Sequence, residues 1–154
     1  MINSAFRLAE GSFVEGDRIN VESVSDFLAT GTFLLATSDL LIRGCVYVEQ
    51  RGRSDITAPD RAYLGLLAVD PGLQQFGLGS LLMQEAEGYC RALGAGVIEI
   101  KVVHLRDELL GFYGRRGYVK TGTSAFPSEV ATKQPCHFVE MSKQLLLPGD
   151  DESA

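Results

Sequence analysis

A glycine-rich turn that joins an apolar strand directly to an amphipathic helix constrains this chain more than any other feature. Residues 66–83 have the sequence LLAVDPGLQQFGLGSLLM. Gly77 and Gly79 carry no Cβ, so the backbone at these positions can approach a ligand closely. The unpaired N–H groups of the first helical turn face outward, with the positive end of the helix dipole behind them. The segment therefore predicts an anion-binding turn that suits a pyrophosphate and needs no lysine.

Three nucleotide-binding patterns compete for this turn. A Walker loop is excluded, because Ser80 and Leu81 follow Gly79 where that loop has Lys and then Ser or Thr. A dinucleotide fingerprint needs a third glycine where Leu82 stands, and an acidic residue placed for a ribose, which the chain lacks. The remaining pattern, Q-x-x-G-x-G over residues 74–79, resembles motif A of the GNAT superfamily of acetyl-CoA-dependent N-acetyltransferases. Alone, the segment also fits a plain strand–turn–helix connection whose glycines serve tight packing.

A second segment, one predicted strand further along, resembles motif B of the same family. Residues 109–118 have the sequence LLGFYGRRGY, in which Gly117 matches the glycine that ends the motif's helix. The resemblance implies that Tyr113 lies near the CoA sulfur and protonates the departing thiolate, a general-acid role. Without motif A, a core aromatic residue would be the simpler interpretation of Tyr113. The two motifs in family order favour the functional interpretation.

The resemblance also implies how cofactor and acceptor meet. The family splays two parallel strands apart and lays pantetheine in the gap, here between the strands predicted over 61–69 and 97–103. Freed backbone groups would bond pantetheine, and one N–H would polarise the acetyl carbonyl. Acetyl then passes directly to a primary amine of a small molecule or peptide in a ternary complex. The implied cofactor-binding residues are Leu67, Ala68, Val69, Gln74, Gln75, Phe76, Gly77, Leu78, Gly79 and Ser80.

The general base is less well determined than the general acid. His104 ends the strand beside the expected acceptor site, and histidine changes charge near neutral pH, so it is our first candidate. Glu99 lies on the same strand but on its opposite face. Glu49 and Tyr63 are alternatives on neighbouring strands, acting directly or through water. For each candidate, a structural polar role is the simpler interpretation.

The order of predicted elements indicates an α/β or α+β domain. The resemblance implies a GNAT fold, a mixed central sheet flanked by helices. The family normally starts with a strand and a helix, and residues 2–7 match only the end of that helix, so the first strand is expected to be missing. Arg115 and Arg116 could approach the CoA phosphates, but a solvated helix end is the simpler interpretation. We predict helices over 20–30, 76–93 and 106–116 and strands over 32–37, 41–49, 61–69, 97–103, 118–123 and 136–143. The helix over 76–93 should bury Leu78, Leu82, Ala86, Tyr89 and Leu93.

Length and charge fit one soluble domain. The 154 residues match a typical domain of about 100–200 residues, which we divide into a GNAT domain over 1–147 and an acidic tail over 148–154. The net charge of -6 argues against a basic nucleic-acid binder, and half of it lies in that tail. The mildly acidic body suits a cationic substrate, but it equally fits a protein kept soluble by its charge.

The cysteines indicate a reducing compartment. Cys45, Cys90 and Cys136 are odd in number and form no CxxC pair, so we expect free thiols that serve packing, and no metal site. No signal peptide is visible, and no apolar run approaches the about 18 residues that span a bilayer. We therefore expect a cytoplasmic protein without membrane or nucleic-acid partners, and a homodimer is left open. The main alternative to an enzyme is a catalytically inactive GNAT-like module that binds CoA or another protein.

Overall fold

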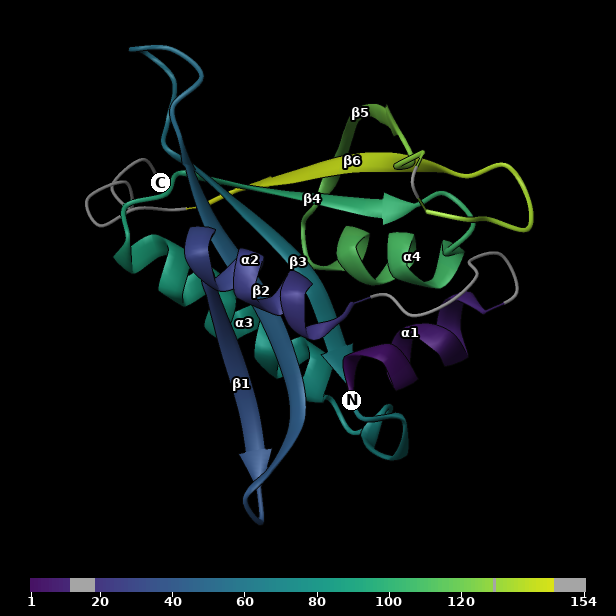
Figure 1. Cartoon of the computed structure of the whole chain (residues 1–154). Helices are drawn as coiled ribbons and strands as arrows, with labels where there is room; N and C mark the ends of the chain where they lie inside the picture. The colour runs from purple at the N-terminus through teal and green to yellow at the C-terminus, as the bar shows by residue number, and fades with distance from the viewer. Residues whose placement is uncertain (12–18, 129, 146–154) are drawn as a thin grey trace.

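A mixed sheet flanked by helices forms the body of the protein. The computed structural model describes residues 1–11, 19–128 and 130–145, so the predicted tail over 148–154 lies outside the described residues. Within these ranges the sheet has six strands in the order β1-β2-β3-β4-β6-β5 (Figure 1), which confirms the predicted fold class. The elements are α1 (Ile2–Glu10), α2 (Val21–Thr30), β1 (Thr32–Ser38), β2 (Leu41–Gly52), β3 (Arg61–Val69), a short 3-10 helix η1 (Pro71–Leu73), α3 (Leu78–Ala92), β4 (Val97–Val103), α4 (Asp107–Arg115), β5 (Val119–Ala125) and β6 (His137–Gln144).

The strand directions divide the sheet into two antiparallel parts that meet at one parallel pair. β1, β2 and β3 form the first part, and β4, β6 and β5 form the second. β3 and β4 run parallel where the parts meet. β1 forms one edge of the sheet and β5 the other.

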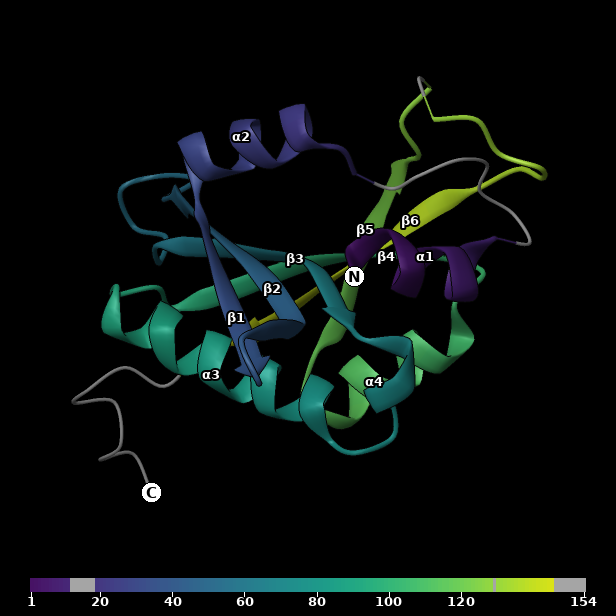
Figure 2. The same cartoon turned by 60° about the horizontal axis from the view of Figure 1, so that its bottom comes forward.

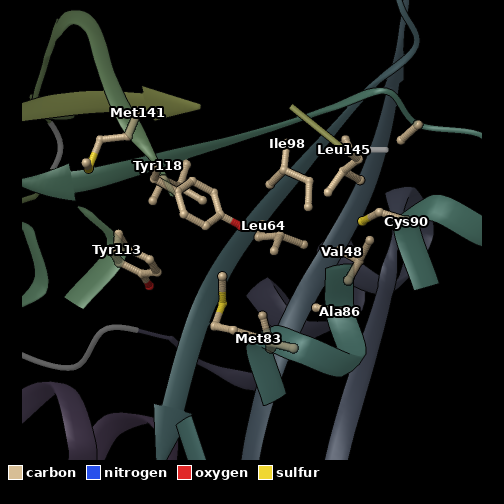
Figure 3. Packing of buried hydrophobic residues seen from close by; sticks show 14 of the residues in the cluster. Val48, Leu64, Met83, Ala86, Cys90, Ile98, Tyr113, Tyr118, Met141 and Leu145 are labelled. Carbon is tan, nitrogen blue, oxygen red and sulfur yellow. The ribbon is translucent and has the colours of Figure 1, made fainter. Parts of the chain in front are cut away.

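Helices cover both faces of the sheet. Figure 2 shows α3 and α4 below the sheet and α1 and α2 above it. Side chains alternate accordingly along β2: Val46 belongs to the core cluster with α3, whereas Cys45 packs with Ala5 of α1 and Tyr47 with Phe27 of α2. The main core therefore lies between the sheet and α3 (Figure 3).

The buried face of α3 is turned slightly from the predicted stripe. Leu82 and Ala86 are buried as predicted, but Leu93 is 40% exposed and Tyr89 is only partly buried. The helix instead buries Met83, Glu87 and Cys90 beside the two predicted residues. Residues 83, 86, 87 and 90 follow the same helical spacing, so the periodicity alone left a choice between two adjacent faces.

Local signals set the limits of α2 and α4. The Asn20 side chain accepts a hydrogen bond from the Ser23 N–H at 2.8 Å and caps the start of α2. α2 ends at Gly31, where a Cβ would lie 2.6 Å from the Tyr47 ring. Gly117 follows α4 with a φ of +96°, a left-handed conformation that favours glycine.

Among the described residues, none of the helices combines the length and apolar character that crossing a membrane requires.

Candidate active site

A cleft of about 670 Å³ opens where β3 and β4 separate. The two strands pair only over 61–63 and 97–99, and beyond these residues they diverge (Figure 1). Over 64–69, β3 therefore pairs with β2 on one edge but has no pairing with β4 on the other. The cleft is lined by both strands, by the turn that leads into α3, and by residues of α1, α2 and α4.

A β-bulge lies in the separated half of β3. Cys45 pairs with Ala68 and Tyr47 with Gly65, so Leu66 and Leu67 together oppose a single residue of β2. Leu66 has a φ of +50°, which is uncommon for a branched side chain. A bulge turns backbone groups out of the strand ladder. Leu67, Ala68 and Val69, which the sequence predicts to contact the cofactor, line the cleft at this point.

The glycine-rich turn brings the N-terminus of α3 to the same cleft. Gly77 precedes α3 with a φ of +78°, no side chain caps the helix, and no acidic residue occupies its first turn. A Cβ at Gly79 would meet only Val69 Cγ2, at 3.9 Å, so the space in front of the helix is open. This end of a 15-residue helix thus fits an anionic group. The predicted residues that line the cleft here are Gln74, Gln75, Gly77, Leu78, Gly79 and Ser80; Phe76 does not, and is 79% exposed.

Tyr113, the predicted general acid, lines the cleft from α4. Its side chain is 7% exposed and packs edge-on against Phe112 and Tyr118, with ring centroids 5.2 and 5.6 Å apart. Figure 3 shows Tyr113 and Tyr118. Burial raises the pKa of the Tyr113 hydroxyl above its ordinary value, and the positive charge of Arg106 opposes that rise only in part. The hydroxyl is therefore neutral at physiological pH and can donate a hydrogen bond.

His104, the predicted base, lies outside the lining of the cleft. Its ring stacks on that of His137, with centroids 4.0 Å apart and planes 11° from parallel. His104 Nδ1 lies 3.2 Å from the His137 backbone nitrogen and 3.3 Å from the His137 carbonyl oxygen, both within hydrogen-bond distance. The structure thus does not bring His104 and Tyr113 together in the cleft. A catalytic role for His104 stays a prediction.

Of the three alternative bases, Tyr63 alone lines the cleft within the described part of the chain. The Arg51 guanidinium lies 4.2 Å from the centre of its ring. Glu49 accepts hydrogen bonds from Arg51 at 2.8 Å and from the Tyr47 hydroxyl at 3.3 Å. Glu99 is bound by Arg61 at 3.2 Å. Glu99 therefore has its partner away from the cleft, whereas Glu49 is linked to the cleft through its hydrogen bond with Tyr47, which lines it.

An ion pair that the sequence does not reveal borders the cleft as well. Glu10 of α1 accepts a hydrogen bond from Arg106 Nη1 at 3.1 Å, and both residues line the cleft. Arg106 also binds Glu108. Because Glu10 and Arg106 are 96 positions apart, no local pattern connects them, and only the tertiary structure identifies the pair.

A second buried carboxylate, Glu87, corrects the interpretation of Arg116. Glu87 is 4% exposed and binds Lys143 Nζ at 3.0 Å and the Tyr118 hydroxyl at 3.2 Å. Arg116 lies 3.7 Å from Glu87 and is 20% exposed, so it does not form the solvated helix end that we expected. Glu87, on the buried face of α3, attracts the Arg116 guanidinium, because a buried carboxylate needs cationic partners.

The cysteines have the properties of packing residues. Cys45, Cys90 and Cys136 are free thiols. Burial raises the pKa of Cys45 and of Cys90 to about 11, so both are neutral at physiological pH and are poor nucleophiles. Within the part of the chain that the structure describes, no three His, Cys, Asp or Glu side chains form a group that could hold a metal ion.

Solved structures of acetyltransferases share this fold. A GNAT family acetyltransferase from Elizabethkingia anophelis with acetyl-CoA bound is 16% identical, with a TM-score of 0.66 over 92% of this chain and 89% of that one. The ribosomal-protein-S18-alanine N-acetyltransferase from Escherichia coli is 14% identical, with a TM-score of 0.68 over 96% of this chain and 90% of that one. An IAA acetyltransferase from Bacillus cereus ATCC 14579 is also 14% identical, with a TM-score of 0.68 over 92% and 91% of the two chains.

The sequence comparisons place the chain in a family without naming a near relative. No curated protein matches the sequence. The family model described as acetyltransferase (GNAT) family matches residues 6–118, which include the turn before α3 and end after the Tyr113 helix. The match covers well over half of the chain and holds both motifs on which the resemblance rests. The chain therefore belongs to the GNAT acetyltransferase family.

Proposed function

We propose that the protein transfers an acetyl group from acetyl-CoA to a primary amine of a small molecule or peptide, directly and within a ternary complex. The observation that carries this proposal is the continuous cleft between β3 and β4, which is lined both by the N-terminus of α3 and by Tyr113. One cleft thus presents an anion-binding turn and a neutral proton donor.

The residues of the cleft fit the cofactor. The free N–H groups at the start of α3 would bind its pyrophosphate, with Gly77 and Gly79 allowing the close approach. Backbone groups of Leu67 and Val69, on the edge of β3 that β4 does not cover, would bind its pantetheine arm. Acetyl-CoA supplies an activated acyl group as a thioester.

The reaction breaks the carbon–sulfur bond of the thioester and forms a carbon–nitrogen bond, while the amine loses one proton and the sulfur gains one. The Tyr113 hydroxyl would donate to the departing sulfur, because burial keeps it protonated. For the base, His104 stays a proposal from the sequence alone. Direct transfer is favoured over an acetyl-cysteine intermediate, because the buried thiols of Cys45 and Cys90 are neutral and therefore poor nucleophiles.

The identity of the acceptor does not follow from the fold. The two neighbours from Escherichia coli and Bacillus cereus are equally similar to this chain, at 14% identity and a TM-score of 0.68, yet one is a ribosomal-protein-S18-alanine N-acetyltransferase and the other an IAA acetyltransferase. A shared fold carries no information on the acceptor.

Calorimetry and an amine panel test the proposal. The folded protein should bind acetyl-CoA, and it should release free thiol when an alkyl monoamine, a polyamine or a peptide with a free N-terminus is added. The Gly79→Trp variant should lose CoA binding, because the new side chain would fill the space in front of α3. Folded protein without affinity for acetyl-CoA would refute the proposal. Binding without thiol release from any amine would favour an inactive CoA-binding module.

A further inference from the structure

Glu10 is a buried acidic residue that helix stability does not explain. It is the last residue of α1 and is 4% exposed. The C-terminal end of a helix carries partial negative charge, so a carboxylate there is disfavoured. Burial of a carboxylate adds a further cost unless both oxygens are bound. The position of Glu10 therefore calls for a partner outside the helix.

The partner that the fold provides, Arg106, binds only one of the two carboxylate oxygens of Glu10. Oε2 accepts the hydrogen bond from Arg106, whereas Oε1 is buried without any hydrogen-bond partner among the described residues. Arg106 is shared, because its Nε binds Glu108. Buried polar atoms without partners are rare in folded proteins, and one on a residue that lines a cleft is a candidate ligand-binding atom.

Glu10 lines the cleft, and it belongs to α1, which lies on the face of the sheet opposite α3 and α4 (Figure 2). On the same face, the rings of Phe27, Tyr47 and Tyr63 line the cleft as well. Among the described lining residues Glu10 is the one carboxylate, and Lys101 and Arg106 are the cations. A half-paired carboxylate suits an ammonium nitrogen, and aromatic rings elsewhere in the same cleft suit the rest of an alkylamine.

We propose that Oε1 of Glu10 binds the nitrogen of the acceptor and selects a cationic alkylamine over an uncharged nucleophile. This inference rests on the proposed acetyl transfer and extends it to the substrate class. The acceptor and the leaving group are then bound from opposite faces of the sheet. Glu10 of α1 binds the amine, and Tyr113 of α4 donates a proton to the departing sulfur.

The Glu10→Gln variant tests the inference with little change in shape. Glutamine keeps an oxygen for Arg106 but places an N–H₂ donor where the free oxygen stands, and that group repels an ammonium. The specificity constant kcat/KM for a cationic alkylamine should fall about 10- to 100-fold, mainly through KM, because a charge-assisted hydrogen bond is lost. For an arylamine, which is uncharged at neutral pH, it should stay within about threefold.

Two controls separate this role from a structural one. CoA affinity, measured by calorimetry, should be the same in Glu10→Gln and wild type. Glu108→Gln removes the other carboxyl that shares Arg106; its side chain is 64% exposed and does not line the cleft, so acceptor kinetics should not change. An equal loss with both classes of amine, or no loss with either, would overturn the proposal.

If Glu10→Gln does not fold, inhibition of the wild type decides. N,N-Dimethylbenzylamine is a cation with one N–H that cannot form a stable amide, and it should inhibit at least about 10-fold more strongly than uncharged benzyl alcohol. Equal inhibition would overturn the proposal. A wild type that binds CoA but acetylates no amine would refute the proposed function, and the role of Glu10 with it.

Discussion

Replacing Gly79 by alanine should stabilise the protein and weaken CoA binding at the same time. Gly79 has no positive φ, and an added Cβ would meet only Val69 Cγ2, at 3.9 Å, which is an ordinary contact. Alanine in a helix is about 0.5–1 kcal/mol more favourable than glycine. The stability of the fold therefore does not explain a glycine at this position. A ligand that approaches the backbone closely would explain it.

The size of the loss in affinity follows from the site. The new Cβ would occupy the open space in front of α3, where Gly79 lines the cleft. Loss of one hydrogen bond from a backbone N–H to a charged phosphate costs about 1.5–3 kcal/mol, which corresponds to a rise in Kd of roughly 10- to 150-fold. Calorimetry with CoA measures this change.

Gly88 of the same helix provides a matched control. It lies in the interior of α3, and a Cβ there would meet nothing within 4 Å. Gly88→Ala should raise the melting temperature by roughly 1–4 °C without changing CoA affinity. Wild-type affinity in a stable Gly79→Ala protein would show that the turn does not bind the pyrophosphate. A loss of stability in Gly79→Ala would show that the backbone argument is wrong.

Three further substitutions examine the proton donor, the predicted base and the buried carboxylate. Tyr113→Phe should bind CoA normally but turn over more slowly in steady-state assays, and unchanged turnover would remove Tyr113 from the general-acid role. Because the pKa of Tyr113 is raised, the donor loses its proton only above the ordinary tyrosine range, and the wild-type rate should not fall for this reason between neutral pH and about pH 9. If His104 is the base, His104→Gln should lower kcat for the acceptor while CoA affinity stays normal, and a wild-type kcat would exclude it. Glu87→Gln should lower the free energy of unfolding by about 2 kcal/mol in urea titrations, because Lys143 and Arg116 lose their charged partner; a change below about 0.5 kcal/mol would contradict the network.

The local structure around the cofactor turn could be predicted because its signals are local. The strands over 61–69 and 97–103 have the predicted limits, since the first is a mostly apolar run, the second alternates, and each ends at a turn or a polar segment. The helix predicted from 76 begins at Leu78 instead, because Gly77 has a positive φ that a helix does not accommodate. The conformational freedom of a glycine in such a turn is a property of the residue itself, so the sequence alone indicates it.

The chemistry around Glu10 could not be predicted in the same way. Glu10, Arg106 and Glu87 are ordinary charged residues in the sequence, and their burial depends on which helix face meets the sheet and on a contact between residues 96 positions apart. For the same reason, nothing along the chain indicates that His104 stacks on His137 outside the cleft.

The sequence by itself determined the family, the strand–turn–helix unit and the tyrosine of the second motif, because backbone geometry and helical periodicity are written in neighbouring residues. Only the tertiary structure decided where β3 leaves β4 and which polar atoms are buried there without partners. Those properties depend on residues brought together from distant parts of the chain, and burial is what turns an ordinary carboxylate into a candidate binding group.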